Sequence, residues 1–351
     1  AYRLVRARLW EVCYHGVRYW LIDGDGIFTR VRRSEDIYTM HRDDYLFFSR
    51  AVMEACESLS WIPEVVSAHD WHMGFLPVVV RHRASALWDT VGTTFTIHNL
   101  AYQGEFGFDT LDAAGVDHRL YNSHQLETYG TVNFLKAGCA FANQVNTVSP
   151  NYAKEIQTAE FGCRLEGLMV HLANHGQLRG ILNGIDMTEH DPWTDPCLPA
   201  HFSSHDLDGK RQCRLAISKE LGLTLDDSTP LLSVISRLSN QKGFDLMVES
   251  CDAMMKMGCA WVVQGLGDSW AAEQLRALEA KYPGKVRFVQ EFSPEIAQRI
   301  YGGADIFLMP SSFEPCGLGQ MFSMRYGNVP VVRRTGGLAD TVQEGVNGFV
   351  F

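Results

Sequence analysis

The chain has 351 residues, of which 46% are hydrophobic and 21% charged, and its formal net charge is −10. That length suits two globular domains, and no apolar run is long enough to span a membrane. The negative charge and the lack of a long basic run argue against nucleic acid as a partner. The nine cysteines include no C-x-x-C pair, which is typical of reduced thiols and not of a disulfide framework or zinc site.

The first half of the chain mixes short apolar runs with longer amphipathic ones. The apolar runs predict strands at residues 17–22, 64–67, 94–97, 145–148 and 180–182. The amphipathic runs predict helices at residues 44–59, 74–82 and 132–142.

The second half alternates strands and helices regularly. We expect strands at 231–235, 260–264, 286–289, 305–309 and 329–332, and helices at 243–257, 269–282, 294–301 and 318–326. The strands are nearly continuous apolar runs, as in a sheet covered by helices on both faces. This alternation predicts an α/β fold with parallel, doubly wound sheets. We place the domain boundary just after the stretch 183–186, which gives domains 1–187 and 188–351.

The first candidate binding motif is SRLSNQKG, residues 236–243, which follows a predicted strand and opens a helix. Arg237 and Lys242 lie five positions apart, so they can converge on one anionic group beside the positive end of the helix. The same two residues fit a solvated loop and helix cap equally well.

The second motif, FEPCGLGQ at 313–320, also joins a buried strand to a helix. Gly317 allows backbone N–H groups to approach a ligand closely, and Glu314 is a carboxylate within reach of sugar hydroxyls. Taken alone, Glu314 is as readily explained as a charge at the start of a helix. The third motif, RTGGLAD at 334–340, is another glycine-rich turn that offers backbone donors to a diphosphate or ribose. Together the three turns line one edge of a crevice.

Two strand ends in the first half carry histidines. HDWH at 69–72 invites a metal interpretation, which we reject because no third ligand has suitable spacing and adjacent His69 and Asp70 point apart in a strand. A packed, hydrogen-bonded strand end is the alternative. His98, in IHNLAYQG at 97–104, is by itself better explained as a core histidine.

Several other enzyme classes lack their motifs. Gly265-Leu266-Gly267 has no third glycine at the dinucleotide-binding spacing, and neither a P-loop nor a G-x-S-x-G elbow occurs. These absences argue against a nicotinamide dehydrogenase, a P-loop NTPase and an α/β-hydrolase.

Taken together, the motifs are far more specific for one protein family than any one of them alone. The chain resembles the bacterial glycogen synthase and plant starch synthase family from about Val17 to Phe351. The matching segments, in the family's order, are SAHDWHMGFLP, TIHNLAYQGEF, VNTVSPNYAKEI, FGCRLEGL, ILNGID, SRLSNQKGFDL, MPSSFEPCGLGQMFSMRYG and VVRRTGGLADTV.

The resemblance implies a GT-B fold, in which two Rossmann-like domains face a central cleft. It implies glucose transfer from ADP-glucose to the non-reducing end of an α-1,4-glucan, with retention of configuration and without a metal or other cofactor. ADP-glucose and the glucan are thus the expected partners. A bacterial cytoplasm is the expected compartment, with a plastid stroma as the alternative. Oligomeric state, and the choice of ADP- over UDP-glucose on physical grounds, are left open.

The resemblance also assigns roles to catalytic residues. Arg237 and Lys242 match the pair that grips the donor phosphates, and Glu314 matches the acid beside the donor glucose. His98 matches the histidine near the glucose hydroxymethyl group, and Asp70 matches an aspartate of the catalytic cleft.

Substrate-binding residues follow in the same way. Cys316, Gly317 and Leu318 match a loop whose backbone meets the glucose hydroxyls. Phe292 falls where an aromatic usually stacks on adenine. In the remaining positions, Thr335 and Gly336 match the turn near diphosphate and ribose, and Asn183 matches an interdomain position close to the donor.

The sequence departs from the family pattern at both ends. The Lys-Thr-Gly-Gly-Leu loop, which supplies a lysine over the donor phosphates, is expected before residue 1, and further helices are expected after Phe351. A fragment of a longer synthase is therefore expected, and its own turnover is open. Phe322 stands where related glycosyltransferases carry a second glutamate, which favours the synthase branch.

Four rival functions remain. A glucan phosphorylase would need a motif for pyridoxal phosphate, which we do not find. A different sugar-nucleotide transferase, such as a sucrose-forming enzyme, disagrees with HDWH and NLAYQG, whereas another retaining GT-B transferase that uses UDP-glucose stays an alternative. A nicotinamide dehydrogenase lacks its glycine fingerprint, as noted above. A glucan- or nucleotide-binding scaffold without turnover is the non-enzymatic alternative.

Overall fold

The computed structural model describes residues 5–28, 41–83 and 85–351. It divides into two compact units: unit 1 comprises Ala1–Thr147 and Ala153–Gly180, and unit 2 comprises Val148–Tyr152 and Ile181–Phe351. By contacts the chain therefore changes unit after Gly180, and the short segment 148–152 also belongs to unit 2. The domain boundary between residues 187 and 188 stays a prediction.

Unit 2 is built on a six-stranded parallel sheet with the strand order β12-β11-β10-β13-β14-β15. Its strands are β10 (Leu231–Ile235), β11 (Ala260–Gln264), β12 (Val286–Val289), β13 (Ile306–Met309), β14 (Val329–Val332) and β15 (Phe349–Val350). The chain runs outward from β10 to β12 and then returns to place β13 on the other side of β10. In open α/β sheets, such a reversal leaves a crevice at the carboxyl ends of the two central strands.

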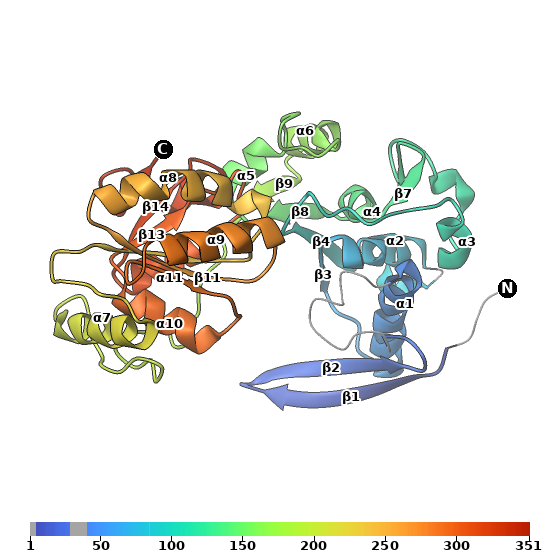
Figure 1. Cartoon of the computed structure of the whole chain (residues 1–351). Helices are drawn as coiled ribbons and strands as arrows, with labels where there is room; N and C mark the ends of the chain where they lie inside the picture. Colours follow the sequence, from blue (N-terminus) through green and yellow to red (C-terminus); the bar gives the residue numbers. More distant parts are fainter. Residues whose placement is uncertain (1–4, 29–40, 84) are drawn as a thin grey trace. The chain divides into compact units, whose positions relative to one another are not determined.

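Helices cover both faces of this sheet (Figure 1). They are α7 (Asp208–Leu221), α8 (Phe244–Lys256), α9 (Ser269–Lys281), α10 (Pro294–Gly303), α11 (Gly319–Arg325) and α12 (Gly336–Thr341). Because side chains alternate along a strand, Trp261 and Val263 pack in the cluster with α8 and α9, whereas Ala260 and Val262 pack with α7 and α10. The predicted fold class, α/β with doubly wound sheets, is confirmed, and the predicted helices and strands of this half lie within a few residues of the observed ones.

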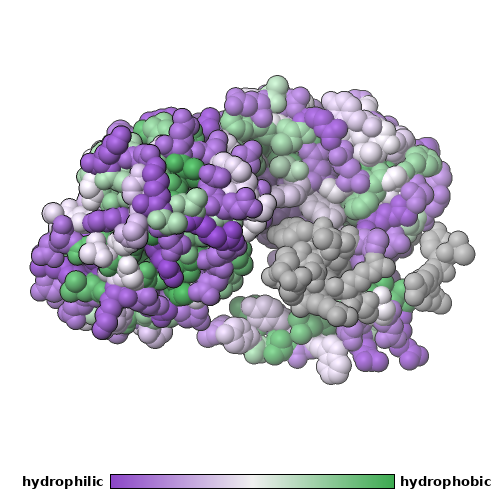
Figure 2. Space-filling view, in the orientation of Figure 1, coloured by the Kyte–Doolittle hydropathy of each residue, from purple (hydrophilic) through white to green (hydrophobic). Residues whose placement is uncertain are grey.

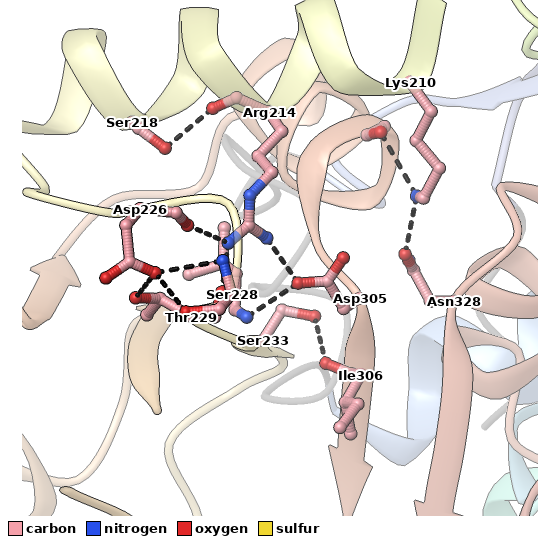
Figure 3. A network of polar contacts seen from close by, with 12 residues as sticks. Lys210, Arg214, Ser218, Asp226, Ser228, Thr229, Ser233, Asp305, Ile306 and Asn328 are labelled. Atoms are coloured by element: carbon pink, nitrogen blue, oxygen red, sulfur yellow. Dashed lines mark hydrogen bonds and ion pairs between the residues drawn. The ribbon is translucent and has the colours of Figure 1, made fainter. Parts of the chain in front are cut away.

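Helix α7 was not predicted from the sequence, and polar contacts attach it to the sheet (Figure 3). The Arg214 guanidinium forms an ion pair with Asp305, which also accepts a hydrogen bond from the Leu231 amide at 2.7 Å. One turn earlier, the Lys210 ammonium donates to the Tyr326 carbonyl and to Asn328 Oδ1, both at 2.9 Å. These contacts join α7 to the loops before β10, β13 and β14.

Unit 1 contains a smaller parallel sheet with the order β3-β4-β8-β9. Its strands are β3 (Val65–His69), β4 (Gly92–Ile97), β8 (Gln144–Thr147) and β9 (Leu178–Gly180). The helices are α1 (Arg42–Ser58), α2 (Phe75–His82), α3 (Thr110–Ala114), α4 (Phe134–Phe141), α5 (Pro150–Glu155), which continues from unit 2, and α6 (Glu166–Asn174). A second sheet is antiparallel, in the order β5-β7-β6, with β5 (Glu105–Phe106), β6 (Glu127–Thr128) and β7 (Thr131–Asn133).

The strand predicted at 17–22 exists but does not join the parallel sheet. It is β2 (Val17–Gly24), paired antiparallel with β1 (Ala7–Tyr14) in a separate two-stranded sheet. The linking residues His15 and Gly16 both have positive φ, which suits a two-residue hairpin turn. Figure 2 shows apolar and weakly polar surface over this hairpin, where Tyr14 is 63% exposed.

Candidate active site

The SRLSNQKG loop lies at the carboxyl end of β10, beside the chain reversal in the sheet. It makes one turn of 3-10 helix, Asn240–Lys242, before α8 begins at Phe244. Gly243 joins the two with a φ of +71°, and a Cβ there would lie 2.4 Å from the Pro310 carbonyl oxygen. Only glycine fits this close approach, which fixes the path of the loop against the end of β13.

The Gly265-Leu266-Gly267 sequence, rejected as a dinucleotide fingerprint, supports this loop. A Cβ on Gly265 would meet the Ser236 carbonyl at 2.0 Å, and one on Gly267 would meet the Leu238 carbonyl at 2.1 Å. The backbone of Leu238 also bonds to Leu266 and Asp268. The two glycines thus let the loops after β10 and β11 pack backbone to backbone.

Lys242 and Glu314 form an ion pair between the first and second motifs. Lys242 Nζ donates to Glu314 Oε2 at 2.6 Å, and the two side chains are only 15% and 10% exposed. Gln241 adds a second link, since its Nε2 donates to the Phe313 carbonyl at 2.9 Å. The sequence treated Lys242 and Glu314 as separate ligand contacts, and the structure shows them paired.

The ion pair borders a cavity of about 180 Å³ at the switch between β10 and β13. Arg237, Lys242, Glu314, Leu318 and Ser311 are among its lining residues. Among the described residues, the Arg237 guanidinium is exposed and has no hydrogen-bond or ion-pair partner. Ser311 is fully buried, and within the same described residues its Oγ also has no partner. The cavity therefore presents one cation and one hydroxyl that are not engaged by protein groups.

The second and third motifs pack directly against each other. The Gly337 amide donates to the Glu314 and Pro315 carbonyls at 3.1 and 3.2 Å. A Cβ on Gly336, where φ is +42°, would lie 1.8 Å from the Glu314 carbonyl oxygen. Gly317 has a φ of +73°, and Gln320 Nε2 donates to its carbonyl at 3.0 Å. The glycines therefore hold the EPCG loop in place from both sides.

The remaining binding candidates of unit 2 lie in and around these loops. Cys316 is buried, which raises the pKa of its thiol, and a backbone hydrogen bond from Asn183 partly offsets that rise. Thr335 is buried at the start of α12, whereas Leu318 is 40% exposed at the cavity. Phe292, after β12, is 85% exposed, the most exposed large apolar side chain among the described residues.

Asp340 connects the third motif to a segment almost two hundred residues earlier. Its Oδ2 accepts hydrogen bonds from Ser149 Oγ at 2.5 Å and from the Asn151 amide at 2.9 Å. Asn151 Nδ2 also donates to the Gly336 carbonyl at 3.3 Å. These bonds explain why Val148–Tyr152, within the VSPNY sequence, belongs to unit 2.

In unit 1, Asp70 and His98 lie together at the ends of β3 and β4. Asp70 Oδ1 accepts a hydrogen bond from the His98 amide at 2.8 Å. His69 Nδ1 and His98 Nε2 are 2.9 Å apart, so one ring donates to the other. Burial and then the His98 charge lower the pKa of His69, which favours its neutral form.

The backbone at His69 and Asp70 differs from the extended strand that the sequence predicts there. The strand stops at His69, and Asp70 has φ 55° and ψ 177°, so the two residues do not alternate in a strand as expected. A non-glycine residue in this region is strained, and such strain clusters at functional sites. Across the described part of the chain, no three His, Cys, Asp or Glu side chains are placed to hold a metal ion.

Known proteins match over the entire chain. A family model described as "Starch synthase catalytic domain" covers residues 2–171, and one described as "Glycosyl transferases group 1" covers 221–351. A glycogen synthase from Desulforudis audaxviator is 39% identical, with 99% of this chain and 71% of that protein covered. One from Desulfitobacterium hafniense is 41% identical, with coverage of 100% and 74%.

The chain belongs to the glycogen and starch synthase family. The catalytic domain of starch synthase IV from Arabidopsis thaliana, bound to ADP and acarbose, has a TM-score of 0.89 at 32% identity, covering 99% of this chain and 74% of that one. A glycogen synthase from Pseudothermotoga lettingae is 45% identical, and 85% of this chain matches 62% of that protein. The predicted family, GT-B fold and glycosyltransferase class are confirmed.

In this synthase, three groups beside the predicted site residues were not identified as site residues from the sequence. They are His69, which bonds His98, Gln241, which ties the two motif loops together, and Ser311 in the cavity. Their signal was only their position inside family segments, because His69 and Gln241 act through contacts distant in sequence and Ser311 is distinguished only by lining the cavity. Phe322, at the position of the second glutamate in related transferases, packs on His190 with ring centroids 4.0 Å apart.

In the described residues, no helix combines the length and apolar character needed to cross a membrane.

Proposed function

We propose that this synthase transfers glucose from ADP-glucose to the non-reducing end of an α-1,4-glucan, with retention and without a metal. The cavity at the β10–β13 switch is the observation that carries the proposal, because Arg237, Lys242 and Glu314 converge there. A nucleotide diphosphate needs fixed cations, and a sugar needs a carboxylate or backbone groups beside its hydroxyls. The cavity offers both kinds of group on adjacent loops.

The Lys242–Glu314 pair gives the donor site a specific starting state. A diphosphate entering the cavity competes with Glu314 for the Lys242 ammonium, while Arg237 is already free of protein partners within the described chain. We assign Arg237 and Lys242 to the diphosphate and Glu314, Cys316, Gly317 and Leu318 to the glucose. Thr335 and Gly336, at the N-terminus of α12, are assigned to the diphosphate and ribose, and Asn183 to the neighbourhood of the donor.

Phe292 is assigned to the adenine ring. A large aromatic side chain that is 85% exposed gains by stacking on a flat ligand, which supports this assignment. The starch synthase IV catalytic domain named above was solved with ADP, which supports an adenine nucleotide for this chain too. UDP-glucose is the alternative donor.

The proposed reaction proceeds on one face of the sugar. The bond from the anomeric carbon to the diphosphate oxygen breaks, and its electron pair stays with the departing ADP. The acceptor hydroxyl oxygen bonds to the anomeric carbon and gives its proton to the departing phosphate oxygen. Arg237 and Lys242 stabilise the negative charge that develops on that phosphate. Asp70 and His98, held to each other in unit 1, are assigned to the catalytic centre and the glucose hydroxymethyl group.

Nucleotide titration tests the donor assignment. We expect ADP to bind more tightly than UDP, and Phe292→Ala to reduce that preference. Arg237→Ala is expected to weaken both nucleotides alike, since both carry a diphosphate. Equal affinities for ADP and UDP in the unaltered protein would contradict the adenine assignment, and a covalent glucosyl adduct on Glu314 or Asp70 would contradict the one-face route. The bacterial relatives support a bacterial cytoplasmic setting, which we propose as the compartment.

A further inference from the structure

Unit 1 contains a cavity of about 620 Å³ that the proposed reaction does not use. It lies between the β6–β7 hairpin, α4, α6 and the residues just before α6. Its volume is typical of small-ligand sites. The lining residues with polar groups or rings that face this space include Ser123, His124, Thr128, Tyr129, Arg164 and His171.

Tyr129 stands at the rim of this cavity in an unfavourable backbone conformation. It is the first residue of the two-residue turn between β6 and β7, with φ 47°, and Gly130 follows with φ 83°. Such turns favour Asn, Asp or Gly at the first position, and a bulky residue there is uncommon. The Tyr129 ring is nevertheless 71% exposed. Neither backbone preference nor burial explains a tyrosine at this position.

A second segment beside the cavity is strained as well. Cys163 and Arg164, in the FGCRLEGL segment, have φ values of 49° and 72°. Gln103 holds the first by donating from Nε2 to its carbonyl at 2.8 Å, and Glu105 holds the second through an ion pair at 2.8 Å. The Arg164 guanidinium lies 5.2 Å from the Tyr129 ring centroid, so it covers one face of the ring. Strained residues in two segments that meet beside this cavity indicate a functional surface.

The charges around the cavity are already satisfied by protein groups. Lys136 Nζ donates to the carbonyls of Ser123 and Glu127 at 2.6 and 2.5 Å. Glu127 Oε1 accepts the Gly130 amide at 2.8 Å, and Arg164 is paired with Glu105. Both cations that line the cavity, Lys136 and Arg164, are therefore already bound to protein groups, which disfavours an anionic ligand such as a nucleotide diphosphate.

Neutral hydrogen-bonding groups remain available. Thr128 is 5% exposed, and among the described residues its Oγ1 has no hydrogen-bond partner. The imidazoles of His124 and His171 each offer one donor and one acceptor when neutral. An open aromatic face beside several such groups suits a ligand with many hydroxyls and apolar C–H faces.

We propose that this cavity, which we call the unit 1 subsite, binds a segment of linear α-glucan. One sugar ring stacks on the open face of Tyr129, and its hydroxyls bond to Thr128 Oγ1 and to the histidines. This inference rests on the proposed function in that the glucan is the acceptor polymer. The subsite holds the polymer and takes no part in the chemistry.

Maltoheptaose titration by calorimetry tests the subsite in the full chain. Tyr129→Asn removes the ring but places a residue that favours the turn, so thermal stability should hold or rise while the Kd increases about three- to tenfold. Thr128→Val removes the hydroxyl at constant shape, and we expect a two- to tenfold increase in Kd. Tyr14→Asn, on the other hairpin and with a similarly exposed tyrosine, is the matched control and should leave the Kd unchanged.

ADP binding, measured on the same samples, separates the two proposals. We expect it to be unchanged in all three variants, and saturating ADP should not displace maltoheptaose. Unchanged maltoheptaose affinity in Tyr129→Asn and Thr128→Val, with ADP bound normally, would overturn the subsite and leave the proposed function standing. Failure of the unaltered chain to bind ADP would refute the proposed function, whatever its affinity for maltoheptaose.

Discussion

The ion pair between Lys242 and Glu314 makes the sharpest prediction, because it separates stability from activity. The pair is nearly buried and its hydrogen bond is 2.6 Å long. Lys242→Met removes a charge-assisted hydrogen bond and leaves a carboxylate without its cation, so the unfolding free energy should fall by about 2–3 kcal/mol. Glu314→Gln keeps the shape and one acceptor oxygen, and should cost about 1–2 kcal/mol.

The double variant decides whether the two residues act as a pair. If they do, the losses are not additive, and the double variant should be about 1–3 kcal/mol more stable than the sum of the single effects predicts. Glucose transfer should not recover in the same way. Loss of the Lys242 charge from the departing phosphate should lower the rate about 10²- to 10³-fold in both the single and the double variant.

Two assays on the unaltered protein, the two single variants and the double variant decide whether Lys242 and Glu314 act as a pair. Denaturant unfolding measures the free energies, and label transferred from ADP-glucose to glycogen measures the rate. Additive stability losses would show that the ion pair is energetically unimportant. Recovery of transfer in the double variant would show that Lys242 acts only by neutralising Glu314, and the phosphate assignment would then be wrong.

Three further predictions concern other parts of the molecule. Gly336→Ala places a methyl group 1.8 Å from a carbonyl oxygen and should cost at least about 2 kcal/mol of unfolding free energy, whereas Gly345→Ala, which also has positive φ but open space, should cost about 1 kcal/mol. The pKa of His69 is lowered from its ordinary 6.5, so neutral His69 contributes its full stabilisation above pH 6.5 and this contribution is lost as the pH falls through the folded-state pKa. The denaturant midpoint of unfolding, measured between pH 8 and 5, should therefore decline less with falling pH in His69→Gln than in the unaltered protein. Lys210→Met leaves buried acceptors unpaired and should lower the unfolding free energy by roughly 1–3 kcal/mol in urea, while Arg211→Met, at an exposed ion pair on the same helix, should change it by less than about 0.5 kcal/mol.

Sequence pattern predicted most of unit 2 because its strands are rich in apolar residues and the central ones, β10 and β11, are almost wholly buried. Runs such as 231–235 and 260–264 are almost entirely apolar, which is typical of strands covered by helices on both faces of a sheet. Helix α7 escaped prediction since its anchoring groups, Lys210 and Arg214, look like ordinary surface charges until the distant residues that bind them are known. The hairpin strand at 17–24 was recognised as a strand, but its partner and direction depend on a turn whose first residue is histidine.

The candidate site, like the fold, could be predicted only in part from the sequence. Family segments placed Arg237, Lys242 and Glu314 on neighbouring loops, and the structure brings all three to one cavity. The sequence did not predict that Lys242 binds Glu314, because a contact between residues 72 positions apart depends on the strand order. The strained Asp70 and the pairing of His69 with His98 likewise follow from backbone geometry at the ends of two adjacent strands. The catalytic and binding roles of these residues remain predictions.

The central claim is that the cavity beside Arg237 and Lys242 activates ADP-glucose for transfer to a glucan. The most direct test incubates the chain with radiolabelled ADP-glucose and glycogen, counts label in the precipitated glucan, and runs UDP-glucose and the Arg237→Ala variant in parallel. The account predicts incorporation from ADP-glucose that exceeds incorporation from UDP-glucose and falls at least tenfold in the variant. Incorporation that is equal in the variant, or absent both from this chain and from a version extended to the length of its relatives, would contradict it.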